Sequence, residues 1–216
     1  MKKLDLKRQF HDLYTPSSRT VSLVRVPKLQ YLMIDGQIEA GEAPGTSPGF
    51  DQAMLALYGI AYTMKFMLKL RPRNPIDYPV MALEGLWWVS DGQFDITVKD
   101  NWLYTLMILT PGVANDKTFQ TARDQVRRKR GENPMLERIR LERFAEGLCM
   151  QTMHIGPYAA EPATVERMKA FAAQGRYEDL VGKGGKHHEI YLGDPRKASP
   201  AKLKTILRHP VRRLNS

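Results

Sequence analysis

Apolar runs alternate with glycine- and proline-rich turns along the chain, and their spacing predicts strands and helices in a regular order. The stretches 20–26 and 29–38 have the composition and alternation of strands. Ser47-Pro48 predicts the start of a helix, because serine is a favoured N-cap and proline a favoured first helical residue. Apolar residues then recur at helical spacing as far as residue 70, and Arg71-Pro72 ends the pattern.

Two further extended segments, 80–91 and 101–111, complete the first half of the chain. Asp91-Gly92 ends the first of them, and a short polar turn leads to the second. Such a short connection favours an antiparallel pair. The first half therefore reads strand, helix, strand, strand.

The second half repeats part of this order. Its predicted elements are a basic helix at 117–130, a helix from Asn133-Pro134 to 146, a strand at 148–158, a helix at 162–174, a strand at 187–195 and a short helix capped by Ser199-Pro200. Strand, helix, strand thus appears twice. We expect one α+β domain over 1–216, with related halves at about 20–112 and 113–212. Helices would cover one sheet face, and the other would be free to line a cleft.

Composition bounds the class of protein. A hydrophobic fraction of 43% suffices for a sizeable core and excludes a disordered chain. No apolar run reaches the roughly 18 residues of a membrane span, and residues 1–14 lack the apolar region of a secretory signal. The single cysteine, Cys149, agrees with a reducing compartment. We therefore expect a cytoplasmic protein without a membrane partner.

The formal net charge of +10 raises the question of nucleic acid. The basic residues gather beside predicted helices, in two clusters: Arg123, Arg127, Arg128, Lys129 and Arg130, and Arg196, Lys197, Lys202, Lys204, Arg208, Arg212 and Arg213. Each cluster is either a solvated helix face or a surface for a polyanion. Neither carries a zinc-finger or RNP-type motif, and the N-terminus has no room for a helix-turn-helix. We do not expect direct binding of nucleic acid.

Several polar residues stand out within apolar strands. Strand alternation places the following groups on common faces: Glu84, Leu86 and Trp88; Trp102 and Tyr104, with Met107 on the reverse; Glu189 and Tyr191. A buried, unpaired carboxylate costs several kcal/mol or takes up a proton. Beside aromatic rings it suits a lipophilic cation, or it acts as a general acid or base. The alternative for each glutamate is an ordinary salt bridge.

The histidines and the cysteine do not form a recognisable metal or nucleophile motif. His187 and His188 are adjacent on a strand, so their side chains point to opposite faces. No HExxH spacing, cysteine cluster, Walker loop, dinucleotide fingerprint or G-x-S-x-G motif is present. His154, at a strand end, has a second interpretation as a partly buried histidine with its hydrogen bonds satisfied. We expect neither a metal nor an organic cofactor.

Five blocks, in order over nearly the whole chain, resemble the signature blocks of GyrI-like proteins. They are YLMIDGQ (31–37), PVMALEGLWWVSDG (79–92), WLYTLMI (102–108), MQTMHIGPYAAEPATVERM (150–168) and HHEIYLGDPRKASPAKLKTILRHPV (187–211). They are most similar to the stand-alone branch, which carries no DNA-binding domain. The resemblance implies a tandem pair of βαββ units, the SHS2-like arrangement, around a central hydrophobic ligand cleft.

The resemblance also implies the binding of aromatic, multidrug-like small molecules. The stand-alone branch resembles enzymes that hydrolyse cyclopropanoid, DNA-alkylating toxins: water opens an activated cyclopropane fused to a cyclohexadienone, which becomes a phenol. We therefore expect a cofactor-independent cyclopropanoid hydrolase that serves detoxification. The alternatives are a non-catalytic protein that sequesters or senses aromatic or cationic ligands, and an interaction protein, such as a gyrase modulator, that works through its basic surface.

Physical roles for the candidate residues follow from that reaction. Electrons move to the dienone oxygen, so a hydrogen-bond donor there, Tyr158 or Tyr191, would stabilise the transition state. Glu189, with Glu84 as the other candidate, would orient or deprotonate the water. Aromatic rings would enclose the flat ligand and exclude solvent. The candidate ligand contacts are Trp88, Trp102, Tyr62, Tyr104, Met107 and His154.

Overall fold

The computed structural model describes residues 1–44, 46–91, 93–99, 101–195 and 197–215. Gly92 of the predicted turn and Arg196 of the basic tail lie outside the described residues. In chain order the elements are β1 (Lys2–Lys3), α1 (Leu6–Gln9), α2 (His11–Tyr14), β2 (Ser22–Val26), β3 (Leu29–Gln37), α3 (Pro48–Leu70), β4 (Ile76–Asp77), β5 (Leu83–Trp88), β6 (Leu103–Leu109), α4 (Asp116–Arg130), α5 (Met135–Arg138), β7 (Arg140–Phe144), β8 (Gly147–Ile155), the 3-10 helix η1 (Tyr158–Ala160), α6 (Glu161–Gln174), β9 (Tyr177–Asp179), β10 (His187–Tyr191), the 3-10 helix η2 (Pro200–Lys202) and β11 (Lys204–Arg213).

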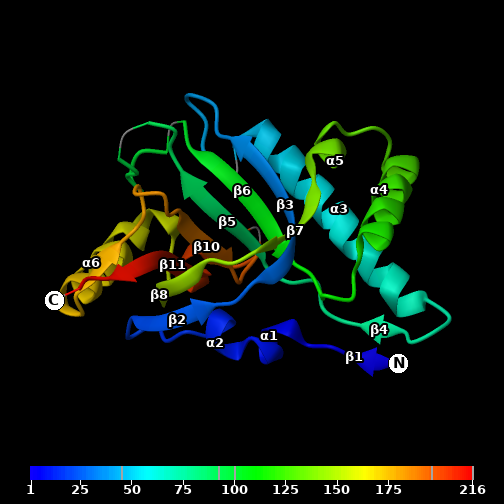
Figure 1. The fold of residues 1–216 in the computed structure, drawn as a ribbon. Helices are drawn as coiled ribbons and strands as arrows, with labels where there is room; N and C mark the ends of the chain where they lie inside the picture. The colour runs from blue at the N-terminus through cyan, green and yellow to red at the C-terminus, as the bar shows by residue number, and fades with distance from the viewer. Residues whose placement is uncertain (45, 92, 100, 196, 216) are drawn as a thin grey trace.

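The large sheet joins two units of the same order (Figure 1). Its strand order is β2-β8-β11-β10-β5-β6-β3-β7, and β9 pairs with β11. The first unit is β3-α3-β5-β6 and the second is β8-α6-β10-β11. They meet where β5 and β10 pair antiparallel, with Gly85 opposite Glu189. The mixed α+β fold and its large antiparallel sheet, with the long helices α3 and α6 on one side, are therefore confirmed.

The outer strands tie the two units together. β2 precedes β3 in the chain but pairs with β8 of the second unit. β7 precedes β8 but pairs with β3 of the first unit. Each unit thus receives its outermost strand from the segment that leads into the other unit.

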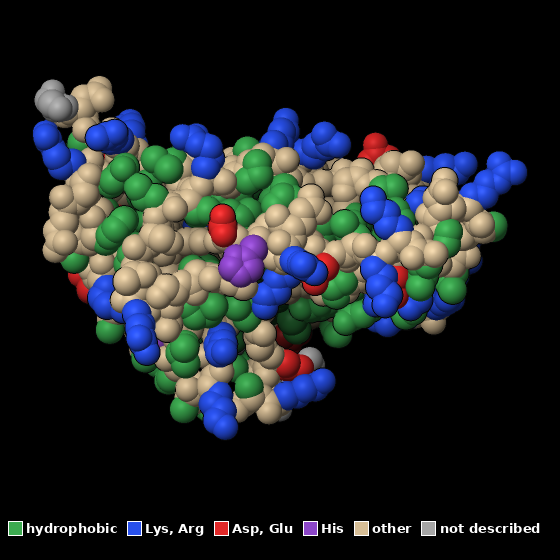
Figure 2. Space-filling model, turned by 90° about the horizontal axis from the view of Figure 1, so that it is seen from below, with side chains coloured by type: hydrophobic (Ala, Val, Ile, Leu, Met, Phe, Trp, Pro, Cys, Tyr) green, Lys and Arg blue, Asp and Glu red, His purple; other side chains and the backbone are tan. Residues whose placement is uncertain are grey.

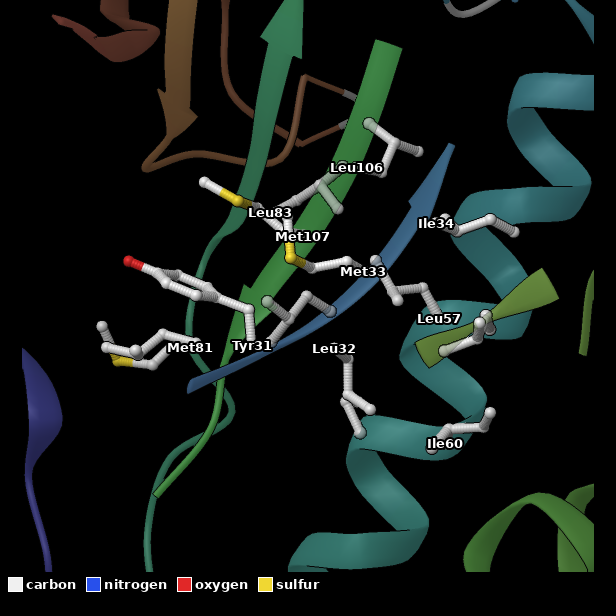
Figure 3. Packing of buried hydrophobic residues seen from close by; sticks show 14 of the residues in the cluster. Tyr31, Leu32, Met33, Ile34, Leu57, Ile60, Met81, Leu83, Leu106 and Met107 are labelled. Atoms are coloured by element: carbon white, nitrogen blue, oxygen red, sulfur yellow. The ribbon is translucent and has the colours of Figure 1, made fainter. Parts of the chain in front are cut away.

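We call the sheet face on which α3 and α6 pack the helix-covered face. It holds most of the core. Figure 3 shows Leu32 and Ile34 of β3 directed toward α3, where Leu57 and Ile60 lie. All four side chains are fully buried. Over the second unit, α6 packs on β8 and β11 through a separate apolar cluster that includes Met150, Val165, Met168 and Leu207. Helix α3 has the length and hydropathy of a membrane span, but its buried positions make it the core helix of the first unit.

One predicted helix is wrong, and one strand was not predicted. The helix predicted from Asn133 to 146 ends after one turn, at Arg138, and Arg140–Phe144 forms the edge strand β7. Pairing with β3 overrides the helix propensity of this charged segment. The short helix predicted at Ser199-Pro200 is the 3-10 helix η2, and the strand β11 that follows it was not predicted. This strand lies in the middle of the sheet and is buried on both faces, so it lacks the simple alternation of a half-buried strand.

The second sheet face is not free to line a cleft, contrary to the prediction. The N-terminal helices α1 and α2 lie against it, below the sheet in Figure 1, and Leu6, Leu13 and Tyr14 are buried there. Figure 2 views this side and shows lysine and arginine side chains spread over the surface rather than gathered in one patch. One member of the basic tail, Arg208, is fully buried.

Candidate active site

Alternation along β10 divides its polar residues between the two faces of the sheet. His187, Glu189 and Tyr191 contact one another on the helix-covered face. His188, between them in sequence, contacts Glu84 and lies on the opposite face. The prediction that the two adjacent histidines point to opposite faces is confirmed.

A continuous chain of hydrogen bonds runs along the helix-covered face. Tyr191 donates its hydroxyl to Glu189 Oε2 at 2.6 Å, and His187 Nε2 lies 3.0 Å from Glu189 Oε1. His187 Nδ1 lies 2.7 Å from His209 Nε2, and His209 Nδ1 lies 2.7 Å from Asp179 Oδ2. We call Asp179, His209, His187, Glu189 and Tyr191 the acid–histidine chain.

Aromatic rings border the acid–histidine chain. Trp87 donates its indole N–H to the Tyr191 hydroxyl at 3.1 Å. Its ring lies 5.3 Å from that of Trp102 and 5.7 Å from that of Tyr104, centroid to centroid. Gly85 makes room for the indole, because a Cβ at this position would come within 2.7 Å of Trp87 Nε1. The aromatic ring positions therefore depend on a strand residue without a side chain.

The charge of Glu189 is stabilised from two sides. Burial alone would raise its pKa, but the hydrogen bonds from His187 and Tyr191 outweigh burial, and the pKa is lowered. Burial and the nearby carboxylate raise the pKa of Tyr191 well above its usual value. An ionised carboxylate next to a neutral phenol is thus the resting arrangement. Glu189 is 6% exposed, and Tyr191 and Tyr158 are partly exposed.

A second acid, Glu161, lies beside this site, and the sequence analysis missed it. It is the first residue of α6 and only 1% exposed. Its Oε1 atom has no hydrogen-bond partner among the described residues. Burial and the negative charge of Glu189 raise its pKa to about 9, against a smaller effect of Lys99. A neutral carboxylic acid therefore faces an ionised one. Glutamate before proline at a helix start looks like ordinary first-turn chemistry, so only burial could have identified it.

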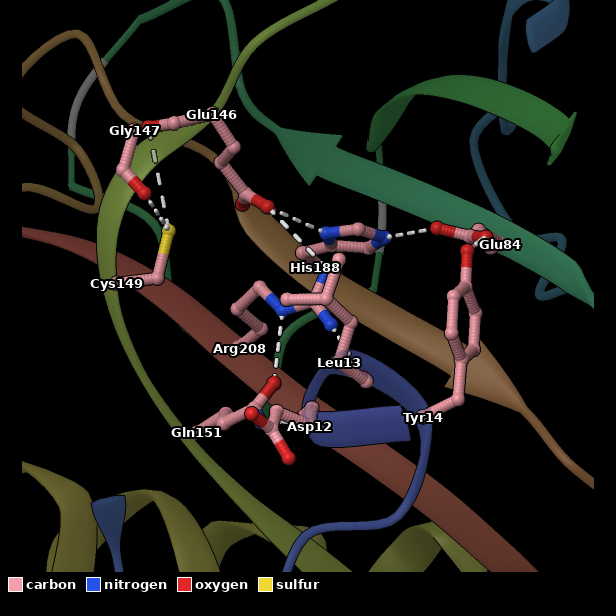
Figure 4. Close-up of polar contacts among 10 residues, drawn as sticks. All are labelled: Asp12, Leu13, Tyr14, Glu84, Glu146, Gly147, Cys149, Gln151, His188 and Arg208. Carbon is pink, nitrogen blue, oxygen red and sulfur yellow. Dashed lines mark hydrogen bonds and ion pairs between the residues drawn. The ribbon is translucent and has the colours of Figure 1, made fainter. Parts of the chain in front are cut away.

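The opposite face carries a different, closed network, drawn in Figure 4. Tyr14 donates to Glu84 Oε1 at 2.6 Å, and His188 lies 3.1 Å from Glu84 Oε2 and 2.9 Å from Glu146 Oε2. Arg208 donates to Gln151 and to the Leu13 carbonyl, and it pairs with Glu146. Burial lowers the pKa of His188, but Glu146 and Glu84 outweigh it, and the pKa is raised. Glu84 thus pairs within a structural network rather than beside Glu189.

The predicted site residues fall into two sets. Five lie along the helix-covered face near one another: Glu189, Tyr191, Tyr158, Trp102 and Tyr104. Tyr158 packs edge-on against Tyr191, with ring centroids 5.9 Å apart.

The structure does not bring the other predicted residues to this place. Trp88 and Met107 lie on the opposite face with Glu84, and the Lys186 ammonium sits 3.3 Å above the Trp88 ring. Tyr62 is 48% exposed on α3. His154 hydrogen-bonds to Thr164 and to the Pro157 carbonyl, as expected for a buried histidine with satisfied nitrogens. On the face of Glu189 and Tyr191 the sheet presents Trp87, the neighbour of the predicted Trp88.

A cavity of about 530 Å³ opens at the far end of the acid–histidine chain. Its lining includes the apolar residues Phe94, Ile96 and Val165 and the polar residues Asp179, His187 and His209. Phe94 stacks on the His187 ring at 5.4 Å between centroids. No cluster of metal-ligating residues suited to a metal ion occurs in the described part of the chain.

Fold and site together define an α+β protein with paired βαββ units and buried acids on its helix-covered face. An uncharacterized conserved protein from Listeria innocua is 36% identical over 97% of this chain and 100% of its own, with a TM-score of 0.87. A hydrolase from Listeria innocua is 34% identical over 97% of this chain and 100% of its own, with a TM-score of 0.81. The chain belongs to the family of these proteins.

More distant similarity extends only to the fold. The C-terminal domain of EcmrR is 12% identical over 90% of this chain and 98% of that domain, with a TM-score of 0.52. No family model matches the chain, and no curated protein matches it. These structural neighbours fit a GyrI-like fold.

Proposed function

We propose that this chain is a stand-alone GyrI-like protein that binds aromatic small molecules and hydrolyses an activated, cyclopropanoid electrophile. The observation that carries the proposal is the pairing of an ionised Glu189 with a neutral Glu161 beside aromatic rings. Two acids held in different protonation states supply a base and an acid in one site. The hydrolase from Listeria innocua, 34% identical, supports a hydrolytic reaction.

In the proposed reaction, Glu189 accepts a hydrogen bond and then a proton from the attacking water. The water oxygen forms a bond to a cyclopropane carbon as the adjacent carbon–carbon bond breaks. The electron pair of that bond moves through the ring to the dienone oxygen, which becomes a phenol oxygen. The net change is the addition of one water molecule, without a redox step.

The developing negative charge on the dienone oxygen needs a donor. Neutral Glu161 and the Tyr158 hydroxyl lie near Glu189 and do not donate to it, whereas the Tyr191 hydroxyl already donates to Glu189. A donor placed before reaction stabilises the transition state without reorganisation. We therefore assign Tyr191 to positioning Glu189, and Glu161 or Tyr158 to the oxygen.

A second candidate function is binding without turnover. An ionised carboxylate among tryptophan and tyrosine rings attracts a flat aromatic cation through charge and cation–π contacts. A sequestering or sensing protein would keep these contacts and need no neutral acid. Glu161 is thus the residue that favours the hydrolase over the binder.

The test is turnover of a spirocyclopropyl-cyclohexadienone compound, followed by mass spectrometry for the gain of one water. Wild type at sub-stoichiometric concentration is compared with Glu189→Gln, Glu161→Gln and an enzyme-free control. We expect multiple turnovers by wild type and a loss of about 100-fold or more in Glu189→Gln, the usual contribution of a general base. Glu178→Gln, a change at a partly exposed side chain that pairs with Arg212, is the matched control and should leave turnover unchanged.

Each of three failures has a specific meaning. Tight binding of the compound without conversion would replace the hydrolase with the binder. Conversion that persists in Glu189→Gln would remove Glu189 from the mechanism. If the protein neither bound nor converted the compound, this class of ligand would be excluded altogether.

A further inference from the structure

The rings beside the base are closed off from solvent by one side chain, Phe94. Trp102 is 1% exposed and His187 is fully buried, so an aromatic ligand cannot stack on either ring in the arrangement that the structure shows. The centroid of the Phe94 ring lies 4.9 Å from that of Trp102, with the planes tilted by 37°. It lies 5.4 Å from that of His187, with the planes within 24° of parallel. Phe94 thus makes the contacts that a flat aromatic ligand would make next to the histidine that binds Glu189.

Phe94 belongs to a loop that packs on the sheet mainly through apolar side chains. Residues 93–99 lie between β5 and β6 and form neither a helix nor a strand. Among the described residues, the hydrogen bonds of this loop stay within it: the backbone N–H groups of Thr97 and Val98 donate to Asp95. Val98 is 56% exposed, and Phe94 itself is only partly buried. The turn can therefore carry the Phe94 ring away without breaking a hydrogen bond to the described part of the sheet.

Space for a ligand lies directly beside the loop. The 530 Å³ cavity is lined by residues 93–97, by the first turns of α6 and by His187. Its volume falls within the roughly 300–1,000 Å³ that is typical of ligand pockets. Because Phe94 and His187 both line this cavity, movement of the Phe94 ring away from the imidazole would connect the cavity with the faces of the buried rings. A ligand stacked there could extend into the cavity along Ile96 and Val165.

We propose that the place of the Phe94 ring against Trp102 and His187 is a binding subsite for a fused, planar aromatic ring system, and that Phe94 fills it until the ligand arrives. The subsite rests on the proposed function, because it holds the aromatic part of the ligand whose hydration Glu189 promotes. Ligand and Phe94 compete for one place, so the measured affinity is reduced by the fraction of molecules in which the subsite is vacant. A fused system covers more of the two buried rings than a phenyl ring does, whereas a single ring gains no more than Phe94 loses.

The first test is calorimetric titration with 2-naphthol, a fused aromatic alcohol that the proposed reaction does not consume. Phe94→Ala should bind it about tenfold more tightly than wild type, as expected if the subsite is vacant in roughly a tenth of wild-type molecules. Phe171→Ala, which shortens a partly buried phenylalanine in the separate cluster under α6, is the matched control and should bind within about twofold of wild type. If Phe94 were a fixed wall of the site, its loss would weaken binding. Unchanged, weaker or absent binding in Phe94→Ala would overturn the subsite.

The second test follows Phe94 itself, because alanine at this position also creates a cavity that any small ring could fill. Wild type labelled with para-fluorophenylalanine is examined by fluorine NMR, and the Phe94 signal is identified by its loss in Phe94→Leu. Saturating 2-naphthol should move this signal toward its position in the urea-unfolded protein, since the ring leaves its aromatic neighbours. The Phe171 signal should stay, and phenol, a single ring, should not displace Phe94. A Phe94 signal that keeps its position at the highest soluble concentration of 2-naphthol would overturn the subsite, and equal displacement by phenol would overturn its preference for fused rings.

The subsite and the hydrolase fail separately. Displacement of Phe94 by 2-naphthol, without turnover of the spirocyclopropyl-cyclohexadienone compound, would support the subsite and reject the hydrolase. Turnover of that compound by wild type, with a KM that rises in Phe94→Ala, would reject the subsite and leave the hydrolase standing.

Discussion

The two faces of the central sheet carry polar networks made of the same residue types but differing in how completely their groups are paired. On the face covered by α1 and α2, Glu84 contacts both Tyr14 and His188, and all three are buried. On the helix-covered face, Glu189 has similar partners, Tyr191 and His187. There, however, Glu161 has one carboxyl oxygen without a hydrogen-bond partner among the described residues, and Tyr191 is partly exposed.

Under the proposed function, this difference separates a network that stabilises the fold from one that takes part in the reaction. A buried network stabilises one structure when all its members are paired. An acid kept neutral beside a carboxylate costs stability and is typical of catalytic sites. The adjacent histidines of β10 thus serve two purposes: His188 joins a network that fixes the N-terminal helices, and His187 belongs to a chain that reaches solvent.

The substitution expected to have the largest effect on stability is the replacement of Arg208. Arg208→Met removes the cation beside Glu146 and leaves that buried carboxylate with less compensation. We expect a loss of about 3–5 kcal/mol in the free energy of unfolding, as for a broken buried ion pair. Arg212→Met, on the same strand but at an exposed pair with Glu178, should cost no more than about 1 kcal/mol. Urea denaturation measures both, and equal losses would contradict a structural network.

The substitution Glu161→Gln should instead increase the free energy of unfolding at neutral pH. A folded-state pKa of about 9 means that Glu161 must take up a proton on folding at neutral pH. Its contribution to stability is greatest below about pH 4.5 and falls as pH rises toward 9. At pH 7 the cost is on the order of 3 kcal/mol, which glutamine removes. The unfolding free energy of Glu161→Gln should therefore exceed that of wild type increasingly from pH 5 to 8.

The prediction for Glu161→Gln would be contradicted if the unfolding free energies of the variant and of wild type differed by the same amount at every pH from 5 to 8. Such a result would mean that Glu161 is ionised in the folded protein and would remove the neutral acid from the proposed mechanism. Glu166→Gln, an exposed change on the same helix beside Lys169, is the matched control and should lack the trend.

Strand β10 shows most clearly what could and could not be predicted from the sequence. Alternation correctly separated His187 from His188 and joined Glu189 with Tyr191, because both are local properties of a strand. It could not place Glu161 near Glu189, since their proximity depends on where α6 packs. It also grouped Glu84 with the site, because alternation does not say which face of one strand matches which face of another. Strand β11 was missed, since burial on both faces removes the alternation that marks a strand.

Tyr14 and Tyr191 donate equivalent hydrogen bonds on the two faces of the sheet, so their phenylalanine variants compare the two networks directly. Tyr14→Phe removes the 2.6 Å hydrogen bond to the fully buried Glu84 and should lower the unfolding free energy by about 1.5–3 kcal/mol. Tyr191→Phe removes a hydrogen bond of the same length to Glu189, which is slightly exposed and keeps His187. Its stability loss should be smaller, about 1 kcal/mol, but turnover should fall.

Urea denaturation and turnover, measured on the same two preparations, give both results for the tyrosine pair. Equal stability losses would mean that the site is as closed as the opposite network. Unchanged turnover in Tyr191→Phe would remove its positioning role.

The smallest expected effect distinguishes the adjacent tryptophans. Trp87→Phe removes the indole N–H donor to Tyr191 and should lower kcat/KM about threefold to tenfold, the equivalent of one neutral hydrogen bond. Trp88→Phe retains a ring beneath Lys186, on the opposite face, and should leave kcat/KM within about twofold, because the change weakens only a partly exposed cation–π contact. If Trp88→Phe were the more damaging, the substrate would have to bind on the face covered by α1 and α2. The closed network there would then have to open, which would reverse the assignment of the two faces.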